Sequence, residues 1–158
     1  MARSDEGTEE DFVVAMRSST LSPMEDALTE QIIGAAIRVQ TTLGPGLLEG
    51  LYQKALAIEL GRVGLQVQRE RVVPVAYLGE PLGEQRLDLV VSERVVVELK
   101  AVETLAQVHR AQLLTYLRIS GLPIGLLINH GTEHIQVKRL LNTHKVSSSC
   151  LRPTAPPC

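Results

Sequence analysis

The sequence predicts a single folded domain of the α/β (α+β) class, with a mixed central sheet flanked by helices. Two segments with helical spacing come first, and four segments rich in β-branched residues follow them. Another helical segment then precedes a short apolar strand. This order favours helices packed on the faces of a mixed sheet. The 158 residues are 44% apolar and 22% charged, which suits a globular protein with its own core.

The two ends of the chain differ in composition from its middle. Residues 1–27 are acidic and rich in Ser and Thr, which predicts a mobile extension. Residues 143–158 are rich in Ser and Pro, which predicts a disordered tail. The folded domain is therefore expected over residues 28–142. Residues 31–158 hold 14 basic and 10 acidic residues, so the body of the chain is mildly basic and compatible with a nucleic-acid partner, and the acidic extension could fold over it as a mimic of nucleic acid.

Composition also argues against several classes of protein. Aromatic residues make up only 3% of the chain, which disfavours a base-stacking platform. The two cysteines, Cys150 and Cys158, lie in the tail and form no zinc-binding pattern. No apolar run approaches the ~20 residues of a membrane span, and the start lacks a signal-peptide pattern. The sequence therefore predicts a cytoplasmic protein with no membrane partner.

The helices are predicted from apolar residues that recur every three or four positions. The first helix is expected to begin near Thr29, a residue type that caps helices, and Gly-Pro-Gly at 44–46 ends it. A second helix is expected over residues 47–63, where Gly64 stops it. A third is expected over residues 104–120, before Gly121 and Pro123.

The strands are predicted from β-branched residues and from alternation with period two. Residues 78–85 are rich in Gly, Pro and Glu, and are expected to form a turn between the second and third strands. An apolar strand and an edge strand are expected after the third helix. The predicted strands are residues 65–72, 73–79, 86–91, 94–100, 124–129 and 133–140.

Charged residues interrupt two of these strands. A three-residue loop at 92–94 would pair Val91 with Val95, and Asp88 would then face Glu98. Neighbouring carboxylates repel each other unless a cation lies between them, and Mg²⁺ is a hard ion that carboxylates hold. Lys100 shares the face of Glu98 and could orient an attacking water or offset the charge of a phosphate. The alternative is a solvated hairpin in which Lys100 forms a salt bridge.

Other polar residues fall near these strands or on the predicted helices. Glu49 lies in the first turn of the second helix, where the helix dipole alone would favour an acid. Gln112 and Tyr116 are four residues apart on the third helix, and either could simply be a core residue. His109 lies three residues before Gln112 on the third helix and could face the same cleft as Gln112 or the solvent. His130 and His134 flank a turn and are expected at the surface.

Three motifs in this chain resemble those of a known family. Gly46, Glu49 and Tyr52 match the GxxExxY signature, and the run from Asp88 to Lys100 matches the PD-(D/E)xK pattern, with Leu87 where Pro is frequent. The stretch 112–116 matches the QxxxY element of RecB-like exonucleases. Over residues 29–141 the chain therefore resembles the GxxExxY family of the PD-(D/E)xK nuclease superfamily.

The resemblance implies a restriction-endonuclease-like core and a metal-dependent nuclease acting on DNA or RNA. It implies that Lys100 handles the attacking water or the scissile phosphate and that Gln112 positions substrate. Tyr52, Tyr116 and His109 would contact substrate or support the site. The implied ligands of Mg²⁺ (or Mn²⁺) are Asp88, Glu98, Glu49 and the backbone carbonyl of Leu99.

Alternative functions follow from the same residues. A nuclease-like module could bind nucleic acid or protein without turnover, as the small size and weak basic charge suggest. A hydrolase of small phosphate compounds could use the same chemistry. The sequence does not distinguish DNA from RNA as the substrate or endonuclease from exonuclease action. A homodimer or a protein partner is also left open.

Overall fold

The computed structural model describes residues 22–143, so nearly all of the predicted extension and of the predicted tail lies outside the described residues. Within this range, no helix has the length and apolar character that crossing a membrane requires. The elements are α2 (Pro23–Leu43), α3 (Glu49–Arg62), β1 (Val67–Tyr77), β2 (Glu80–Val91), β3 (Val95–Lys100), α4 (Gln107–Ser120), β4 (Ile124–Asn129) and β5 (Gln136–Leu141).

The five strands form one mixed sheet in the order β1-β2-β3-β4-β5. Strands β3 and β4 are parallel and are joined through α4, whereas all the other neighbours are antiparallel. All of β4 is buried, and only Lys100 of β3 is partly exposed. The predicted α+β fold with a mixed central sheet is therefore present, and its centre is the parallel pair.

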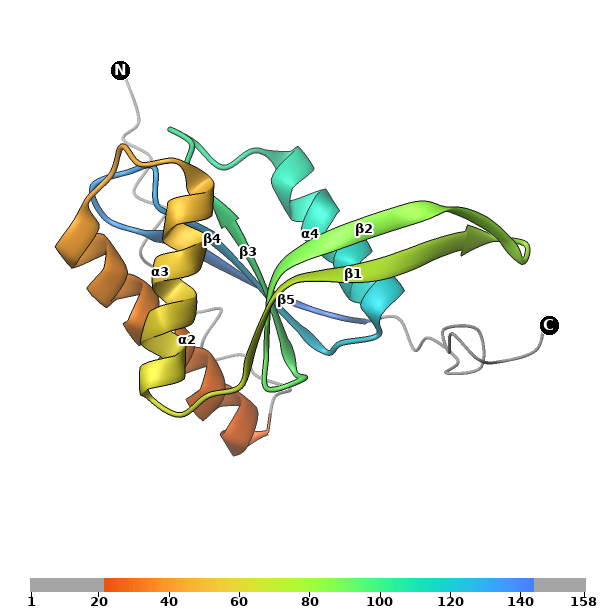
Figure 1. Ribbon diagram of the computed structural model, residues 1–158, viewed down its shortest axis with the longest axis horizontal. Coiled ribbons are helices and arrows are strands. Elements are labelled where there is room, and N and C mark those ends of the chain that lie inside the picture. Colours follow the sequence, from red (N-terminus) through yellow and green to blue (C-terminus); the bar gives the residue numbers. More distant parts are fainter. Residues whose placement is uncertain (1–21, 144–158) are drawn as a thin grey trace, which may run out of the picture.

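Helices cover both faces of the sheet (Figure 1). On one face, α2 and α3 pack through residues such as Ile32 and Leu56 against Leu89 and Val97. On the other face, α4 packs through Leu113, Tyr116 and Leu117 against Val90, Val96 and Leu127. Because strand side chains alternate, Glu98 and Lys100 share the α4 face with Val96.

Helix α2 begins at Pro23, so the predicted start near Thr29 is wrong. Ser22 caps the helix: its hydroxyl accepts a hydrogen bond from the Glu25 amide, and the Glu25 carboxylate accepts from the Ser22 amide. Thr29 is buried inside the helix and donates its hydroxyl to the Glu25 carbonyl at 2.7 Å. The Ser-Pro-x-Glu pattern at 22–25 is the sequence signal that identifies this start.

Strands β1 and β2 form one long hairpin, so two of the predicted strands are a single strand. The predicted turn at 78–85 is also wrong, because only Leu78 and Gly79 separate the strands, and both have positive φ. Pro74 and Pro81 resemble strand breakers in the sequence. Neither interrupts ladders on both sides, because β1 is an edge strand and β2 pairs with β3 only over residues 89–91.

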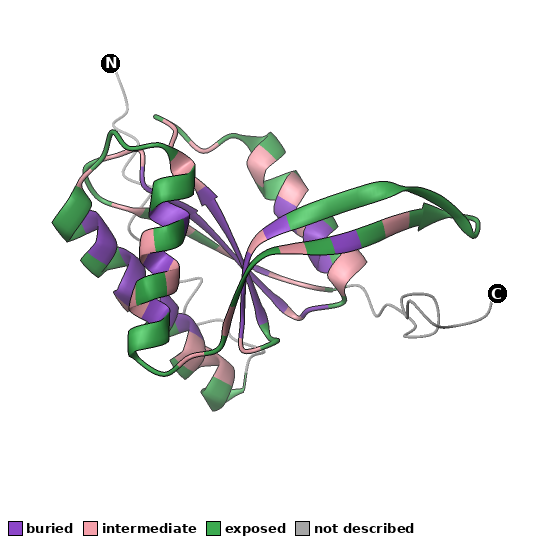
Figure 2. Cartoon of the chain, in the orientation of Figure 1, coloured by how far each residue is buried: buried purple, intermediate pink, exposed green. Residues whose placement is uncertain are grey.

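The hairpin bends at Asp88. The β1–β2 register omits a pair between Glu70 and Asp88, and Glu70 has a left-handed φ of 51°. Leu89 packs in the core under α2 and α3, but Leu87 packs in the core under α4. In a regular strand these two side chains would share a face. Beyond the bend, the outer part of the hairpin, which we call the arm, projects with most of its residues exposed (Figure 2).

Candidate metal centre

Three carboxyl groups from three different elements meet near the C-terminal end of β3. Glu49 comes from the first turn of α3, Asp88 from the bend in β2 and Glu98 from β3. One oxygen of each lies within 4.8 Å of the others. The predicted pairing of Val91 with Val95 is present, and it brings Asp88 and Glu98 into this group. We call these three residues the carboxylate cluster.

Glu98 is the most deeply buried member, with 3% of its surface exposed. Its Oε1 lies 3.6 Å from Lys100 Nζ, whereas its Oε2 is buried and has no hydrogen-bond partner among the described residues. Burial, reinforced by Asp88 and Glu49 and opposed by Lys100, raises the pKa of Glu98 to about 8. A buried carboxyl oxygen without a donor is costly, and it is the ligand type that hard divalent cations prefer. The donor set therefore fits a divalent ion.

Asp88 takes the place of a main-chain acceptor at the end of the β2–β3 ladder. That pairing stops at Leu89 and Val97, and the next amide to point toward β2, that of Leu99, donates to Asp88 Oδ2 at 2.9 Å. Burial raises the pKa of Asp88, and the Leu99 amide and Lys100 oppose the shift. The hydrogen bond fixes one oxygen of the carboxylate.

The backbone of Leu99 is oriented toward the same gap. The carbonyl of Lys100 accepts from the His130 amide at 2.8 Å, on the β4 side of the strand. Backbone groups of successive strand residues point to opposite sides, so the amide and the carbonyl of Leu99 both point toward β2. The predicted carbonyl ligand therefore faces the side on which Asp88 lies.

Glu49 is positioned by the loop that precedes α3. Gly46 has a φ of 106°, which favours glycine, and Glu49 follows as the first helical residue. Tyr52 is fully buried, and its hydroxyl accepts from the Leu47 amide at 3.1 Å and donates to the Gly44 carbonyl. Burial raises the pKa of Glu49, with Lys100 lowering it and Asp88 raising it. Tyr52 therefore ties down the loop that carries Glu49.

The residues predicted on α4 fall into two groups. The Gln112 side chain donates to the Tyr116 hydroxyl at 2.7 Å. The pKa of Tyr116 is raised by burial and by the negative charges of Glu98 and Asp88, so this pair lies within electrostatic reach of the cluster. His109 instead accepts from the Ala106 amide through Nδ1 at 3.0 Å, at the start of the helix. It lies outside the group of three carboxylates.

A comparison with known families adds independent information. A family model with the description PD-(D/E)XK nuclease superfamily matches residues 26–140. The chain belongs to this superfamily. No curated protein and no solved structure gives a significant match. The superfamily membership and the mixed sheet together agree with the predicted restriction-endonuclease-like fold, and PD-(D/E)XK nucleases generally depend on a divalent metal.

Gln53 lies beside the carboxylate cluster but was not predicted from the sequence. It is 6% exposed, its Nε2 faces Asp88 Oδ1 at 3.4 Å, and its Oε1 accepts from Arg69 at 3.1 Å. Its position one turn after Glu49 on the same helix is the only sequence signal, because neutral amides are common on helices.

The predicted surface position of His130 is wrong, whereas His134 is exposed as expected. His130 is fully buried, its ring stacks on Tyr52 with 4.6 Å between centroids, and its Nδ1 lies 2.7 Å from Gln40 Oε1. The turn folds inward because Gly131 packs directly on the Val102 backbone, where a Cβ would not fit. The apolar run at residues 124–128 ends before the polar pair Asn129 and His130, so the spacing of the sequence gives no signal for the burial of His130.

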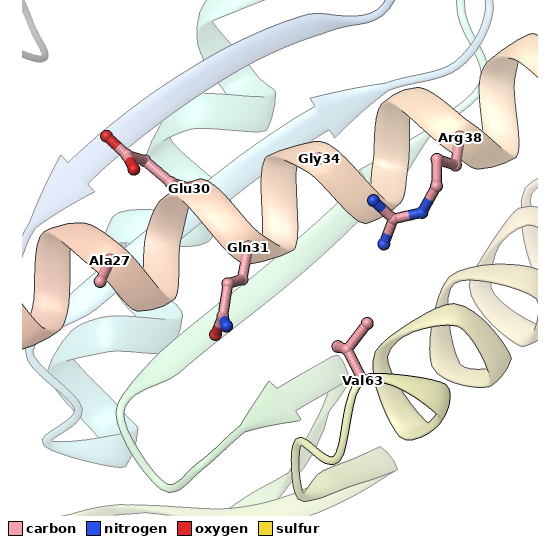
Figure 3. Close-up of a pocket in the computed structure, with 6 residues that line it drawn as sticks. All are labelled: Ala27, Glu30, Gln31, Gly34, Arg38 and Val63. Atoms are coloured by element: carbon pink, nitrogen blue, oxygen red, sulfur yellow. The ribbon is translucent and has the colours of Figure 1, made fainter.

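A separate pocket of about 380 Å³ lies between α2 and the end of α3 (Figure 3). Its lining includes Gln31, Arg38 and Val63 and no member of the carboxylate cluster. It is therefore distinct from the carboxylate cluster.

Proposed function

We propose that the protein is a GxxExxY-type, metal-dependent nuclease that hydrolyses phosphodiester bonds in DNA or RNA. The observation that carries this proposal is the buried Glu98 oxygen without a donor, crowded by Asp88 and Glu49. Burying like charges together is unfavourable unless a cation neutralises them. Membership of the PD-(D/E)XK nuclease superfamily supports nucleic acid as the substrate.

Four groups would hold the ion, which we take to be Mg²⁺ or Mn²⁺. They are the carboxylates of Asp88, Glu98 and Glu49 and the backbone carbonyl of Leu99. When bound, such an ion lowers the pKa of a coordinated water and neutralises charge on a phosphate. Because Asp88 is already fixed by the Leu99 amide, one of its oxygens is oriented before any ion arrives.

The remaining site residues act on water and substrate. Lys100 Nζ lies beside Glu98, where the ammonium group can orient a water or stabilise negative charge on the phosphate in the transition state. Gln112 and Tyr116 present a hydrogen-bonded pair from α4, which can position a substrate group. Tyr52 supports the loop before Glu49, and His109, in the first turn of α4, can meet the nucleic acid outside the cluster.

The test is a cleavage panel of linear, nicked and single-stranded DNA and of RNA, each with Mg²⁺ or Mn²⁺. We expect the wild type to cleave at least one substrate, and Asp88→Asn to reduce cleavage about 100-fold or more, because a ligand and its charge are lost. Glu133→Gln removes an exposed carboxylate between β4 and β5 and is the matched control. A wild type that leaves every substrate intact contradicts the nuclease proposal.

A binding module without turnover is the second candidate, because the carboxylate cluster alone does not require cleavage. A thermal-shift titration with Mg²⁺ separates the two functions. Stabilisation by Mg²⁺ that disappears in Asp88→Asn, together with an inactive cleavage panel, would support the binding module. Stabilisation together with cleavage supports the nuclease.

A further inference from the structure

We propose that Arg69 binds a phosphate of the nucleic acid beside the metal centre, and that Gln53 positions both Arg69 and the Asp88 carboxylate. This inference rests on the proposed function and extends it to the way in which the substrate is recognised. Arg69 would contact the backbone of the nucleic acid, whereas Gln53 is a positioning residue that acts through its two neighbours.

Gln53 joins the cluster to Arg69 through the two ends of one buried amide. The Oε1 atom accepts from Arg69 Nη2 at 3.1 Å, and the Nε2 atom faces Asp88 Oδ1 at 3.4 Å. An amide oxygen can only accept and an amide NH₂ can only donate, so this orientation suits a cation on one side and a carboxylate on the other. The guanidinium therefore lies two hydrogen bonds from a predicted metal ligand.

Arg69 keeps most of its binding capacity for a ligand. Its side chain is exposed, and a guanidinium has five N–H donors in a planar fork that matches phosphate. Its partner Gln53 is neutral, so this contact leaves the charge of Arg69 in place. Four other arginines of the described part each meet a carboxylate instead: Arg38, Arg71, Arg94 and Arg139.

The bend of the hairpin keeps Arg69 beside the site. Arg69 pairs with Leu89 on the sheet side of the bend, and the next residue, Glu70, has the left-handed φ of 51°. Beyond it, Arg71 pairs with Leu87 on the arm and binds Glu93. Arg69 is therefore the last β1 residue before the chain turns away from Asp88.

The formal charges make nucleic-acid binding depend on the metal. With all three carboxyl groups ionised, the cluster and Lys100 carry a formal charge of −2, and with the proton kept on Glu98 they carry −1, so the site repels phosphate in either state. A divalent ion cancels this charge, and Arg69 then gives the site a positive excess. We therefore expect the ion to bind before the nucleic acid. Once the ion has neutralised the cluster, the positive charge of Arg69 attracts the phosphate.

The experiment measures oligonucleotide affinity by fluorescence anisotropy across a salt series, with Ca²⁺ replacing Mg²⁺ and with intact oligonucleotide verified on a gel. Arg69→Gln should weaken binding about tenfold at low salt and reduce the slope of log K against log salt by about 0.7–0.9, the value of one phosphate contact. Arg69→Lys should restore the slope but only part of the affinity, because an ammonium lacks the planar fork. Arg62→Gln, at the other end of α3, is the control and should change neither quantity.

Metal affinity separates the roles of the two residues. Arg69→Gln should leave the Mg²⁺-induced thermal shift unchanged, whereas Gln53→Met, of similar volume, should weaken Mg²⁺ binding about tenfold and nucleic-acid binding as well. An Arg69→Gln variant that matches Arg62→Gln in affinity and slope overturns the inference, even if the wild type cleaves. A wild type that binds no nucleic acid with Ca²⁺ and cleaves none with Mg²⁺ overturns both the inference and the proposed function.

Discussion

Two polar regions lie side by side in this fold, one partly buried and one fully buried, and their polar atoms are paired to different extents. The carboxylate cluster holds like charges and leaves Glu98 Oε2 without a donor. The second region, which we call the neutral cluster, consists of Gln40, Tyr52 and His130. There Gln40 Nε2 donates to the Thr132 carbonyl at 2.6 Å, and the Gln40 oxygen meets His130 Nδ1. Only the neutral nitrogen His130 Nε2 lacks a partner in that cluster.

The difference indicates what each region is for. Neutral groups that satisfy one another stabilise a fold without a ligand, whereas crowded charges with an orphan oxygen need a cation. The two regions are also linked, because the His130 amide binds the Lys100 carbonyl and Tyr52 lies one turn after Glu49. The neutral cluster therefore holds the elements on which the carboxylate cluster is built.

The largest effect is expected from Glu98→Gln. The folded protein keeps the Glu98 proton up to about pH 8, but the unfolded chain releases it near 4.5, so stability without metal falls as the pH rises between these values. Removing the charge should raise the free energy of unfolding at pH 8 by about 4 kcal/mol. Urea unfolding at pH 5, 6.5 and 8 in a chelator measures this change, with Glu133→Gln as the control. Equal pH slopes in the variant and the wild type would contradict it.

A somewhat smaller effect, in the opposite direction, is expected from Gly131→Ala. This variant should lower the free energy of unfolding, and it tests the rigidity of the loop that holds the neutral cluster. The added methyl would overlap with the Val102 backbone, and backbone cannot move without breaking the Asn129 contacts to Val102. We expect a loss of about 3 kcal/mol in the free energy of unfolding. Gly125→Ala is the matched comparison and should cost about 1 kcal/mol, since the atoms nearest to its methyl group belong to the Leu113 side chain and not to the backbone. Similar losses of stability for both variants would mean that the loop at Gly131 can shift to accommodate the methyl group, and would contradict its rigidity.

The pH response of His130 should oppose that of Glu98. Burial lowers the pKa of His130 to about 4, whereas the unfolded chain takes up the proton near 6.5. Stability from this residue is therefore lost as the pH falls through that window, by about 2 kcal/mol between pH 6.5 and 5. In a Glu98→Gln background this loss should be visible in urea unfolding, and adding His130→Phe should abolish it. A loss that persists in the double variant would assign it to another group.

The smallest effect is expected from Tyr52→Phe, which keeps the stack on His130 but removes the hydroxyl contacts to Gly44 and Leu47. The free energy of unfolding should fall by about 1 kcal/mol. Mg²⁺ affinity should also fall several-fold, because the loop before Glu49 loosens. Calorimetric titration with Mg²⁺ measures this coupling. Unchanged affinity would mean that the two regions are independent.

The sequence predicted the parts of this molecule that depend on local patterns. The short loop at 92–94 and the alternation of β3 were enough to bring Asp88 and Glu98 together, and Gly-Pro-Gly marked the start of the loop before Glu49. The arm was missed because the Gly, Pro and Glu content of residues 78–85 indicated a turn. Pro81 is tolerated in β2 because this part of the strand pairs with β1 only, and the sequence does not reveal which side of a strand is unpaired.

Two buried polar residues could not be predicted for a different reason. Gln53 has no charge or motif of its own, and its importance comes from Arg69 and Asp88, which are distant in sequence. His130 stands beside Gly131 and was assigned to an exposed turn, but the close approach of Val102 brings that turn inside. Both depend on tertiary contacts that a single sequence does not encode in its spacing.

Because of the bend at Asp88, the length of the arm can be changed without changing the rest of the sheet. Beyond it, β2 has no pairing with β3, so the length of the hairpin is set by its own Leu78–Gly79 turn. Inserting or deleting one residue on each side of that turn would lengthen or shorten the projection while leaving the Leu89–Val97 rung in register. The end of the arm can thus be replaced by other hairpin sequences without altering the carboxylate cluster beside the bend.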